Sequence, residues 1–230
     1  MLPLLIILYI KKHKTRLAVL FRSFIINKIV IIKLVTLIVS FLLIAKLAFT
    51  QTKSYHYDIS KGGSSIGEAV LTNTISGTAN TVSLVSNIKY RFMFLFTATS
   101  KEEVVFVNGI MTFSSLYREQ NGNKKIAQKT TRASAKYVVA VNNEKEKELN
   151  IATINYQTLC LYTTEPVIYQ QVYIDKFQQL VAIQKISAHQ YKVVFPDGNY
   201  NEYYYQDGVC QMVKVHQSLY NVQIELKKIF

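Results

Sequence analysis

The chain has 230 residues, no Trp, two Cys and a formal net charge of +13. The first 50 residues contain eight Lys and Arg and no Asp or Glu, so the other 180 residues carry 19 basic and 14 acidic side chains, a net charge of only +5. That mild charge gives no reason to expect a nucleic-acid partner, and 180 residues suffice for one domain with a buried core.

The basic N-terminal segment leads into an apolar stretch. An uncharged run of 12 residues covers 34–45, and the stretch reaches 17 residues from Ile29 if Lys33 is included. A signal-peptide core has about 7–15 apolar residues, whereas a membrane-spanning helix needs about 20. Because positive charge before an apolar helix stays on the cytoplasmic side, we expect the rest of the chain on the far side of the membrane.

Two outcomes of this targeting stay open. Ala48 and Thr50 are small residues at −3 and −1 of a cleavage before Gln51, which favours a cleaved signal peptide in residues 1–50. Thr is a poor residue at −1, so an uncleaved transmembrane helix is the alternative. Both outcomes predict membrane contact through residues 29–49 at least during export. They also predict a single periplasmic or extracellular domain, residues 51–230, which in the alternative stays membrane-anchored outside the cytoplasm.

Alternating apolar and polar residues dominate the chain after residue 50. In the stretch 81–92, one face carries Val82, Leu84, Ile88 and Tyr90, with Phe92 after them, and the other face is polar. Such alternation predicts a half-buried antiparallel strand. The same pattern recurs from 55–59 to 137–141 and again in 180–186, separated by Gly- and Asn-containing turns. It indicates a strand-rich domain rather than a helical one.

The C-terminal part reads as a meander of four strands. Pro196-Asp197-Gly198-Asn199 separates 189–195 from 200–206, and Asp207-Gly208 separates 200–206 from 209–216. Pro presets a turn, and Asp-Gly is among the strongest hairpin signals. A fourth strand is expected at 222–228. With about ten or eleven strands in all, the sheet is expected to curl or to form a partly open barrel, because strands twist.

One segment breaks the strand pattern. Tyr156, Leu159, Cys160 and Tyr162 have helical spacing, and Glu165-Pro166 ends the segment. We therefore predict a short helical segment near 154–162 lying across the sheet. The fold class is all-β and mainly antiparallel, preceded by an N-terminal hydrophobic helix.

Three blocks resemble a known family. They are Tyr55-His56-Tyr57-Asp58-Ile59 with Ser65-Ile66-Gly67, Leu159-Cys160-Leu161-Tyr162 with Glu165-Pro166, and Tyr191-Lys192-Val193 with Pro196-Asp197-Gly198, Asn201, Tyr203 and Asp207-Gly208. In this order they resemble secreted Bacteroidetes proteins of an uncharacterised, β-rich domain-of-unknown-function family, family 6134. The resemblance implies an exported, curled β-sheet. It supplies no known activity, so it implies no catalytic residue.

Two groups of residues are candidate site or structural features. Tyr200, Tyr203 and Tyr205 lie in one strand, and their rings and hydroxyls suit an apolar or sugar-like ligand; the alternative is that Tyr is simply favoured in strands. Cys160 and Cys210 form a candidate disulfide if the domain is exported to an oxidising compartment. Simple burial of both thiols is the alternative.

No motif points to catalysis, a cofactor or a metal. Gly62 and Gly67 have the spacing of a phosphate loop, but Glu68 and Ala69 follow where Lys and Ser or Thr are needed, so a hairpin turn is favoured. The histidines of the domain are scattered, and no Ser lies in a nucleophile elbow. A basic stretch at 124–136 is interpreted as a solvated edge strand.

The function favoured by these observations is that of an exported cell-envelope module, non-enzymatic and either binding or structural. A large curled sheet suits an apolar or lipid-like small molecule, by analogy of fold with envelope lipid carriers. The alternative is a hydrolase of envelope polymers without a recognisable motif. A cleft holding two carboxylates would favour that alternative.

Overall fold

The computed structural model of the chain describes residues 28, 33–37, 50–91, 94–142, 144, 146–218 and 220–230. The chain divides into two units, Met1–Phe49 and Thr50–Phe230. Residues 28 and 33–37 are helical, and Thr50, the last residue of the predicted signal peptide or anchor, begins a strand. The other residues of that segment lie outside the described residues. Within the described part of the chain, no helix combines the length and the apolar character needed to cross a membrane.

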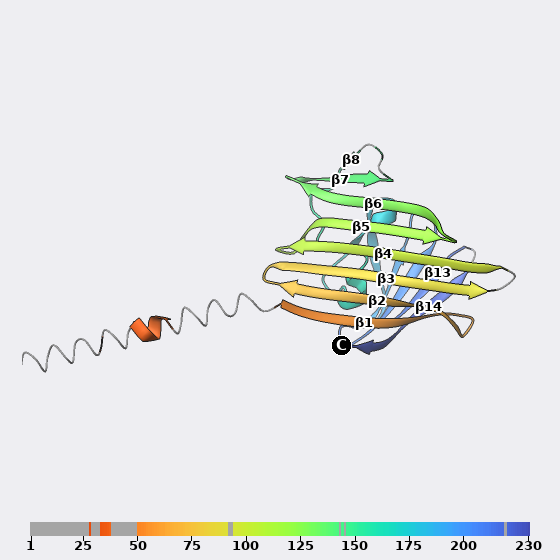
Figure 1. Cartoon of the computed structure of the whole chain (residues 1–230), viewed down its shortest axis with the longest axis horizontal. Coiled ribbons are helices and arrows are strands. Elements are labelled where there is room, and N and C mark those ends of the chain that lie inside the picture. Colours follow the sequence, from red (N-terminus) through yellow and green to blue (C-terminus); the bar gives the residue numbers. More distant parts are fainter. Residues whose placement is uncertain are drawn as a thin grey trace, which may run out of the picture. The chain divides into compact units, whose positions relative to one another are not determined.

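The unit Thr50–Phe230 is built on one sheet of 14 strands (Figure 1). The strands are β1 (Thr50–Lys61), β2 (Ser64–Ser76), β3 (Ala79–Arg91), β4 (Leu95–Val107), β5 (Ile110–Gln120), β6 (Asn123–Ala133), β7 (Lys136–Val141), β8 (Lys147–Leu149), β9 (Gln171–Ile174), β10 (Gln179–Ser187), β11 (Gln190–Val194), β12 (Tyr200–Gln206), β13 (Val209–His216) and β14 (Asn221–Ile229). All neighbouring strands in it are antiparallel, which confirms the predicted fold class. The short strands β8 and β9 were not predicted.

The first and the last strand in the chain pair with each other and so join the two halves of the domain. The strand order is β8-β7-β6-β5-β4-β3-β2-β1-β14-β13-β12-β11-β10-β9, so each half is a meander and β1 joins β14. The sheet order ends at β8 and β9 and does not close into a barrel in the described residues. Figure 1 shows β1–β7 in front and β13 and β14 passing behind them, so the sheet curls over on itself.

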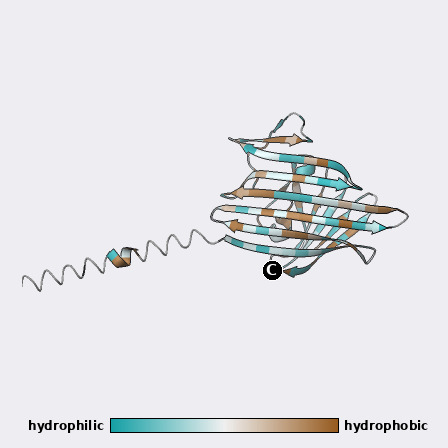
Figure 2. Cartoon of the chain, viewed as in Figure 1, coloured by the Kyte–Doolittle hydropathy of each residue, from teal (hydrophilic) through white to brown (hydrophobic). Residues whose placement is uncertain are grey.

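The alternation predicted from the sequence sets the core. Along β3, Val82 and Leu84 are buried, whereas Lys89 and Asn87 are exposed; the predicted face partner Phe92 lies outside the described residues. Figure 2 shows the resulting alternation of hydrophilic and hydrophobic residues along the strands. The inward faces of both meanders supply one hydrophobic core. The concave side of the curl is therefore the apolar side.

A connecting stretch between β8 and β9, residues 154–166, packs inside the curl and is called the crossing segment. It begins beside β5, where the Met111 backbone N–H donates to the Ile154 carbonyl (2.8 Å). It ends at the β12–β13 turn, where the Glu165 N–H donates to the Gly208 carbonyl (3.0 Å). The segment thus bridges the two meanders.

The helix in the crossing segment is shorter than predicted. Among the described residues of the unit Thr50–Phe230, only α2 (Cys160–Thr163) and a later 3-10 turn, η1 (Asp175–Phe177), are helical. Upstream of α2, backbone groups of Ile154, Tyr156 and Thr158 bond to strand residues instead, and Gln157 forms a parallel bridge with Tyr173. Tertiary hydrogen bonding therefore outweighs the helical spacing of these side chains.

The crossing segment closes one end of the curl. Its contacts at Gly109 and Gly208 lie in the β4–β5 and β12–β13 turns. The opposite ends of β4 and β13 lead to the β3–β4 and β13–β14 connections. We call the first end the closed end and the second the open end.

Glycines at the start of β2 confirm the hairpin interpretation. Gly62 and Gly63 adopt positive φ angles of +57° and +81° in the turn between β1 and β2, a conformation that Gly adopts without steric cost. At Gly67 a Cβ would lie 2.2 Å from the Asn87 carbonyl oxygen, so this site needs a residue without a side chain.

The basic stretch is not an edge strand, and that interpretation is wrong. β6 carries Lys124, Lys125, Lys129 and Arg132, and it lies between β5 and β7. The edge positions belong to β7's partner β8 and to β9. The error arises because basic residues in a strand indicate that one face is exposed to solvent. They do not indicate whether the strand lies at the edge of the sheet, which depends on partners distant in sequence.

Candidate ligand-binding cavity

A cavity of about 980 Å³ opens inside the curl. Its lining includes the apolar side chains Ile59, Ile66, Ala69, Leu84, Ile88, Phe96, Ala98, Leu116, Leu159, Ile174, Val215, Val222 and Ile224. They come from both meanders and from the crossing segment. Phe94, Gln217 and Tyr220 also line the cavity and belong to the β3–β4 and β13–β14 connections, which places its mouth at the open end.

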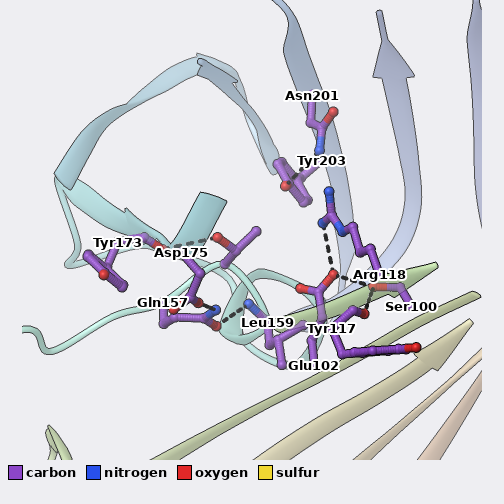
Figure 3. A network of polar contacts seen from close by, with 11 residues as sticks. Ser100, Glu102, Tyr117, Arg118, Gln157, Leu159, Tyr173, Asp175, Asn201 and Tyr203 are labelled. Carbon is purple, nitrogen blue, oxygen red and sulfur yellow. Dashed lines mark hydrogen bonds and ion pairs between the residues drawn. The ribbon is translucent and has the colours of Figure 1, made fainter. Parts of the chain in front are cut away.

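An ion pair stands in the wall of this cavity. The Arg118 guanidinium on β5 donates to the Glu102 carboxylate on β4 (2.9 Å), and the Ser100 hydroxyl donates to the same oxygen (2.8 Å) (Figure 3). The Glu102 side chain is 12% exposed and that of Arg118 is 46% exposed. Glu102 raises the pKa of Arg118, so the guanidinium remains charged.

A second polar group surrounds Asp175 in η1. Its Oδ1 accepts a hydrogen bond from the Ser114 hydroxyl (2.5 Å) and its Oδ2 accepts one from the Gln157 amide (2.6 Å). The Gln128 amide donates to its backbone carbonyl (2.7 Å). Since Ser114 lies on β5, Gln128 on β6 and Gln157 in the crossing segment, Asp175 ties three elements together beside the cavity.

Burial changes the acidity of this carboxyl. Removal from water raises the pKa of Asp175 to about 6, and hydrogen bonds from Ser114 and Gln157 oppose that rise. Gln157 is itself held, because its side-chain oxygen accepts the Leu159 backbone N–H (2.6 Å). The network therefore fixes the crossing segment at the point where Leu159 enters the cavity wall.

The structure separates the three candidate tyrosines. Tyr203 and Tyr205 are buried on the inward face, and the Tyr205 hydroxyl donates to the Leu161 carbonyl (2.6 Å). Tyr200 lies on the other face, stacked on His216 with ring centroids 4.3 Å apart. Among the described residues, the cavity lining includes none of the three; it includes their neighbour Asn201.

The two cysteines are both buried free thiols in the structure. Burial raises the pKa of Cys160 and of Cys210 to about 12, which keeps the thiols protonated. They belong to neighbouring parts of the core, since the Tyr57 hydroxyl contacts the carbonyls of both Tyr162 (3.2 Å) and Cys210 (3.3 Å). The disulfide stays a prediction.

The histidines of the domain lie apart. His56 packs on Phe230 and His216 on Tyr200. His189 at the closed end pairs with Glu165 (3.0 Å). Burial would raise the pKa of Glu165, but its hydrogen bonds outweigh that effect and lower the pKa below its ordinary value. Within the described ranges, no group of three or more His, Cys, Asp and Glu gathers as a metal site would require.

Sequence reasoning missed the polar groups of the cavity, although a signal was present. Along β4, Glu102 falls on the same face as the buried Val104 and Phe106. Along β5, Arg118 falls on the same face as the buried Leu116. A charged residue at an inward position of a strand is uncommon and indicates a polar site inside the fold.

Comparisons with known proteins support the fold. A crystal structure of a β-barrel-like protein of domain of unknown function DUF1849 from Brucella abortus matches with a TM-score of 0.52 at 11% identity, covering 77% of this chain and 96% of that chain. This likeness shows the fold alone. No curated protein matches the sequence. The Bacteroidetes origin stays a prediction. The model of the family described as domain of unknown function DUF6134 matches residues 57–227, and the chain therefore belongs to that family.

Proposed function

We propose that the domain is an exported, non-enzymatic binding module that holds an apolar, lipid-like ligand inside the curled sheet. The observation that carries this proposal is the cavity of about 980 Å³ with a mainly apolar lining. Ligand sites typically measure 300–1,000 Å³ and combine apolar walls with a few polar groups. Water forms few hydrogen bonds with apolar walls. An apolar molecule that replaces this water is therefore stabilised by the hydrophobic effect.

The N-terminal segment supports the export part of the proposal. Its eight basic residues precede or flank an apolar run and contrast with the mild charge of the domain. An exported carrier meets lipid at the membrane surface and must shield it from water. A cavity that is closed at one end and open at the other suits that task.

The experiment compares ligand binding by the purified domain and two Trp variants. Native mass spectrometry and solvent extraction detect a co-purifying ligand, and an apolar fluorescent dye reports the empty cavity. Ala98→Trp fills the cavity and should reduce dye binding at least about tenfold. Lys89→Trp places the same side chain on the exposed face of the neighbouring strand and should leave binding unchanged. Equal binding by both variants, or no binding by the parent domain, would contradict the proposal.

A hydrolase is the second candidate, because the cavity lining contains both Glu102 and Asp175. Paired carboxyl groups can act as acid and base in glycoside hydrolysis, and a carboxyl with a raised pKa suits the acid; the pKa of Asp175 is raised to about 6. Against this, each carboxylate already accepts hydrogen bonds from protein neighbours. Release of soluble fragments from peptidoglycan, lost in Asp175→Asn, would favour the hydrolase. No release by the parent domain would contradict it.

A further inference from the structure

We propose that the ligand is an anionic amphiphile whose charged head binds Arg118 inside the cavity while its apolar chain lies along the wall formed by β1–β3, β13 and β14. This inference rests on the proposed function and adds the chemical class of the ligand. It depends on how the charged and polar groups of the cavity are partnered.

Arg118 has unused hydrogen-bonding capacity that faces the cavity. A guanidinium carries five N–H groups, and within the described chain only Glu102 accepts a side-chain hydrogen bond from Arg118. Its side chain is 46% exposed and lines the cavity. Arg offers its remaining donors in a planar fork, the geometry that carboxylates and phosphates match.

Glu102 holds the guanidinium in place and also competes for it. The carboxylate of Glu102 accepts from Arg118 and from Ser100, so the pair is ordered before a ligand arrives. An anionic head adds a second acceptor to Arg118. Because both anions share one cation, removing the charge of Glu102 should strengthen binding of the ligand.

Asn201 supplies a complementary acceptor. Its side-chain oxygen is buried and has no hydrogen-bond partner among the described residues, whereas its amide nitrogen donates to the Tyr203 hydroxyl (3.2 Å). Asn201 lines the same cavity as Arg118. A buried acceptor without a partner is costly, and a hydroxyl or protonated oxygen on the ligand head would satisfy it.

The cavity wall has an apolar part for the ligand's chain and a charged part for its head. The wall from β1–β3, β13 and β14 is lined by residues such as Ile59, Leu84, Ile88, Val215, Val222 and Ile224. Lys61 and Lys125 also line the cavity and add positive charge, which raises the local concentration of anions. Lys176 pairs with Asp197 (3.0 Å), and the lining also contains the acidic Glu119. A molecule with one anionic end and one hydrocarbon chain matches both parts.

Calorimetric titration of the full domain with three twelve-carbon probes tests the inference: dodecanoate, dodecanol and dodecylammonium, at about pH 8, where the fatty carboxyl is ionised. The parent domain should bind dodecanoate about tenfold or more tightly than dodecanol, the value expected for hydrogen bonds to a charged group. Arg118→Gln should remove that difference. Glu102→Gln should strengthen dodecanoate binding roughly threefold or more, without strengthening dodecanol binding.

Controls separate a binding role from a structural one. The double variant E102Q/R118Q removes the ion pair without leaving an unpaired charge and should bind dodecanoate and dodecanol equally. Lys129→Gln, on the exposed part of β6 outside the cavity lining, removes one positive charge and should leave the preference intact.

The outcomes distinguish failure of the anionic ligand from failure of the proposed binding function. Equal binding of dodecanoate and dodecanol by the parent domain, or tighter binding of dodecylammonium, overturns the anionic ligand but leaves an apolar binding module. Weaker dodecanoate binding in Glu102→Gln also overturns it. If neither the probes nor an apolar dye bind the parent domain, the proposed function fails as well.

Discussion

The closed and open ends of the curl use similar side chains differently. At the closed end, buried tyrosines donate to backbone carbonyls: Tyr57 to Tyr162, Tyr137 to Met111, and Tyr205 to Leu161. At the open end, residues such as Ile88 and Ile224 are only half-buried and face the cavity. One end of the continuous sheet therefore stabilises the fold, while the other leaves apolar surface free for a ligand.

Truncating one apolar side chain at each end gives the largest expected contrast. Leu161 is fully buried in α2, so Leu161→Ala should lower the free energy of unfolding by about 2–5 kcal/mol. Ile224 already borders an open cavity, so Ile224→Ala should cost roughly 1 kcal/mol or less. Urea denaturation of the two variants measures both values. Equal losses would show that the open end is packed as tightly as the closed end.

The buried carboxyl between the two ends predicts a pH dependence of stability. The pKa of Asp175 is about 6 in the folded domain against an ordinary value of 3.8. Between these values the folded state holds a proton that the unfolded state has lost, so stability should fall as the pH rises from about 4 to about 6. The fall should reach about 3 kcal/mol at most.

Comparing the parent domain with Asp175→Asn isolates this contribution. Urea denaturation at several pH values should show the downward slope in the parent domain and a smaller slope in the variant, which has no titrating group at this position. Ser114→Ala should keep a slope, because it removes a donor and leaves the buried carboxyl. An identical slope in the parent domain and in Asp175→Asn would contradict the assignment.

Two adjacent tyrosines give the smallest contrast. Tyr205→Phe leaves the buried Leu161 carbonyl without its side-chain donor and should cost about 1–2 kcal/mol. Tyr204 donates to Glu202 on the outward face, where water can replace it, so Tyr204→Phe should cost less than about 0.5 kcal/mol. Thermal unfolding compares the two. A larger loss in Tyr204→Phe would reverse the assigned faces.

Local pattern predicted the strands but not their global partners. The alternation in 81–92 and the turns at Pro196 and Asp207 identified strands and hairpins, because both signals depend on neighbouring residues. The pairing of β1 with β14 joins residues about as far apart as the domain allows. Nothing in the local sequence of either strand specifies that partner.

The candidate site was predicted less well for a related reason. The tyrosine cluster was singled out by its composition, yet neither Tyr203 nor Tyr205 is among the described residues that line the cavity, and Tyr205 instead donates to the Leu161 carbonyl at the closed end. Asp175 is followed by Lys and Phe in a short turn and resembles a surface residue in sequence. Its burial follows from the crossing segment, whose position only the tertiary structure shows. The sequence did contain one usable signal, the charged residues Glu102 and Arg118 at strand positions that face inward.

Residue-specific NMR of the domain titrated with dodecanoate tests the separation of the two ends most directly. We expect chemical-shift changes at Ile88, Ala98 and Ile224, which line the cavity, and little change at Val139, in the packed core outside its lining. Changes confined to the exposed face of the sheet, or spread equally over both ends, would contradict it.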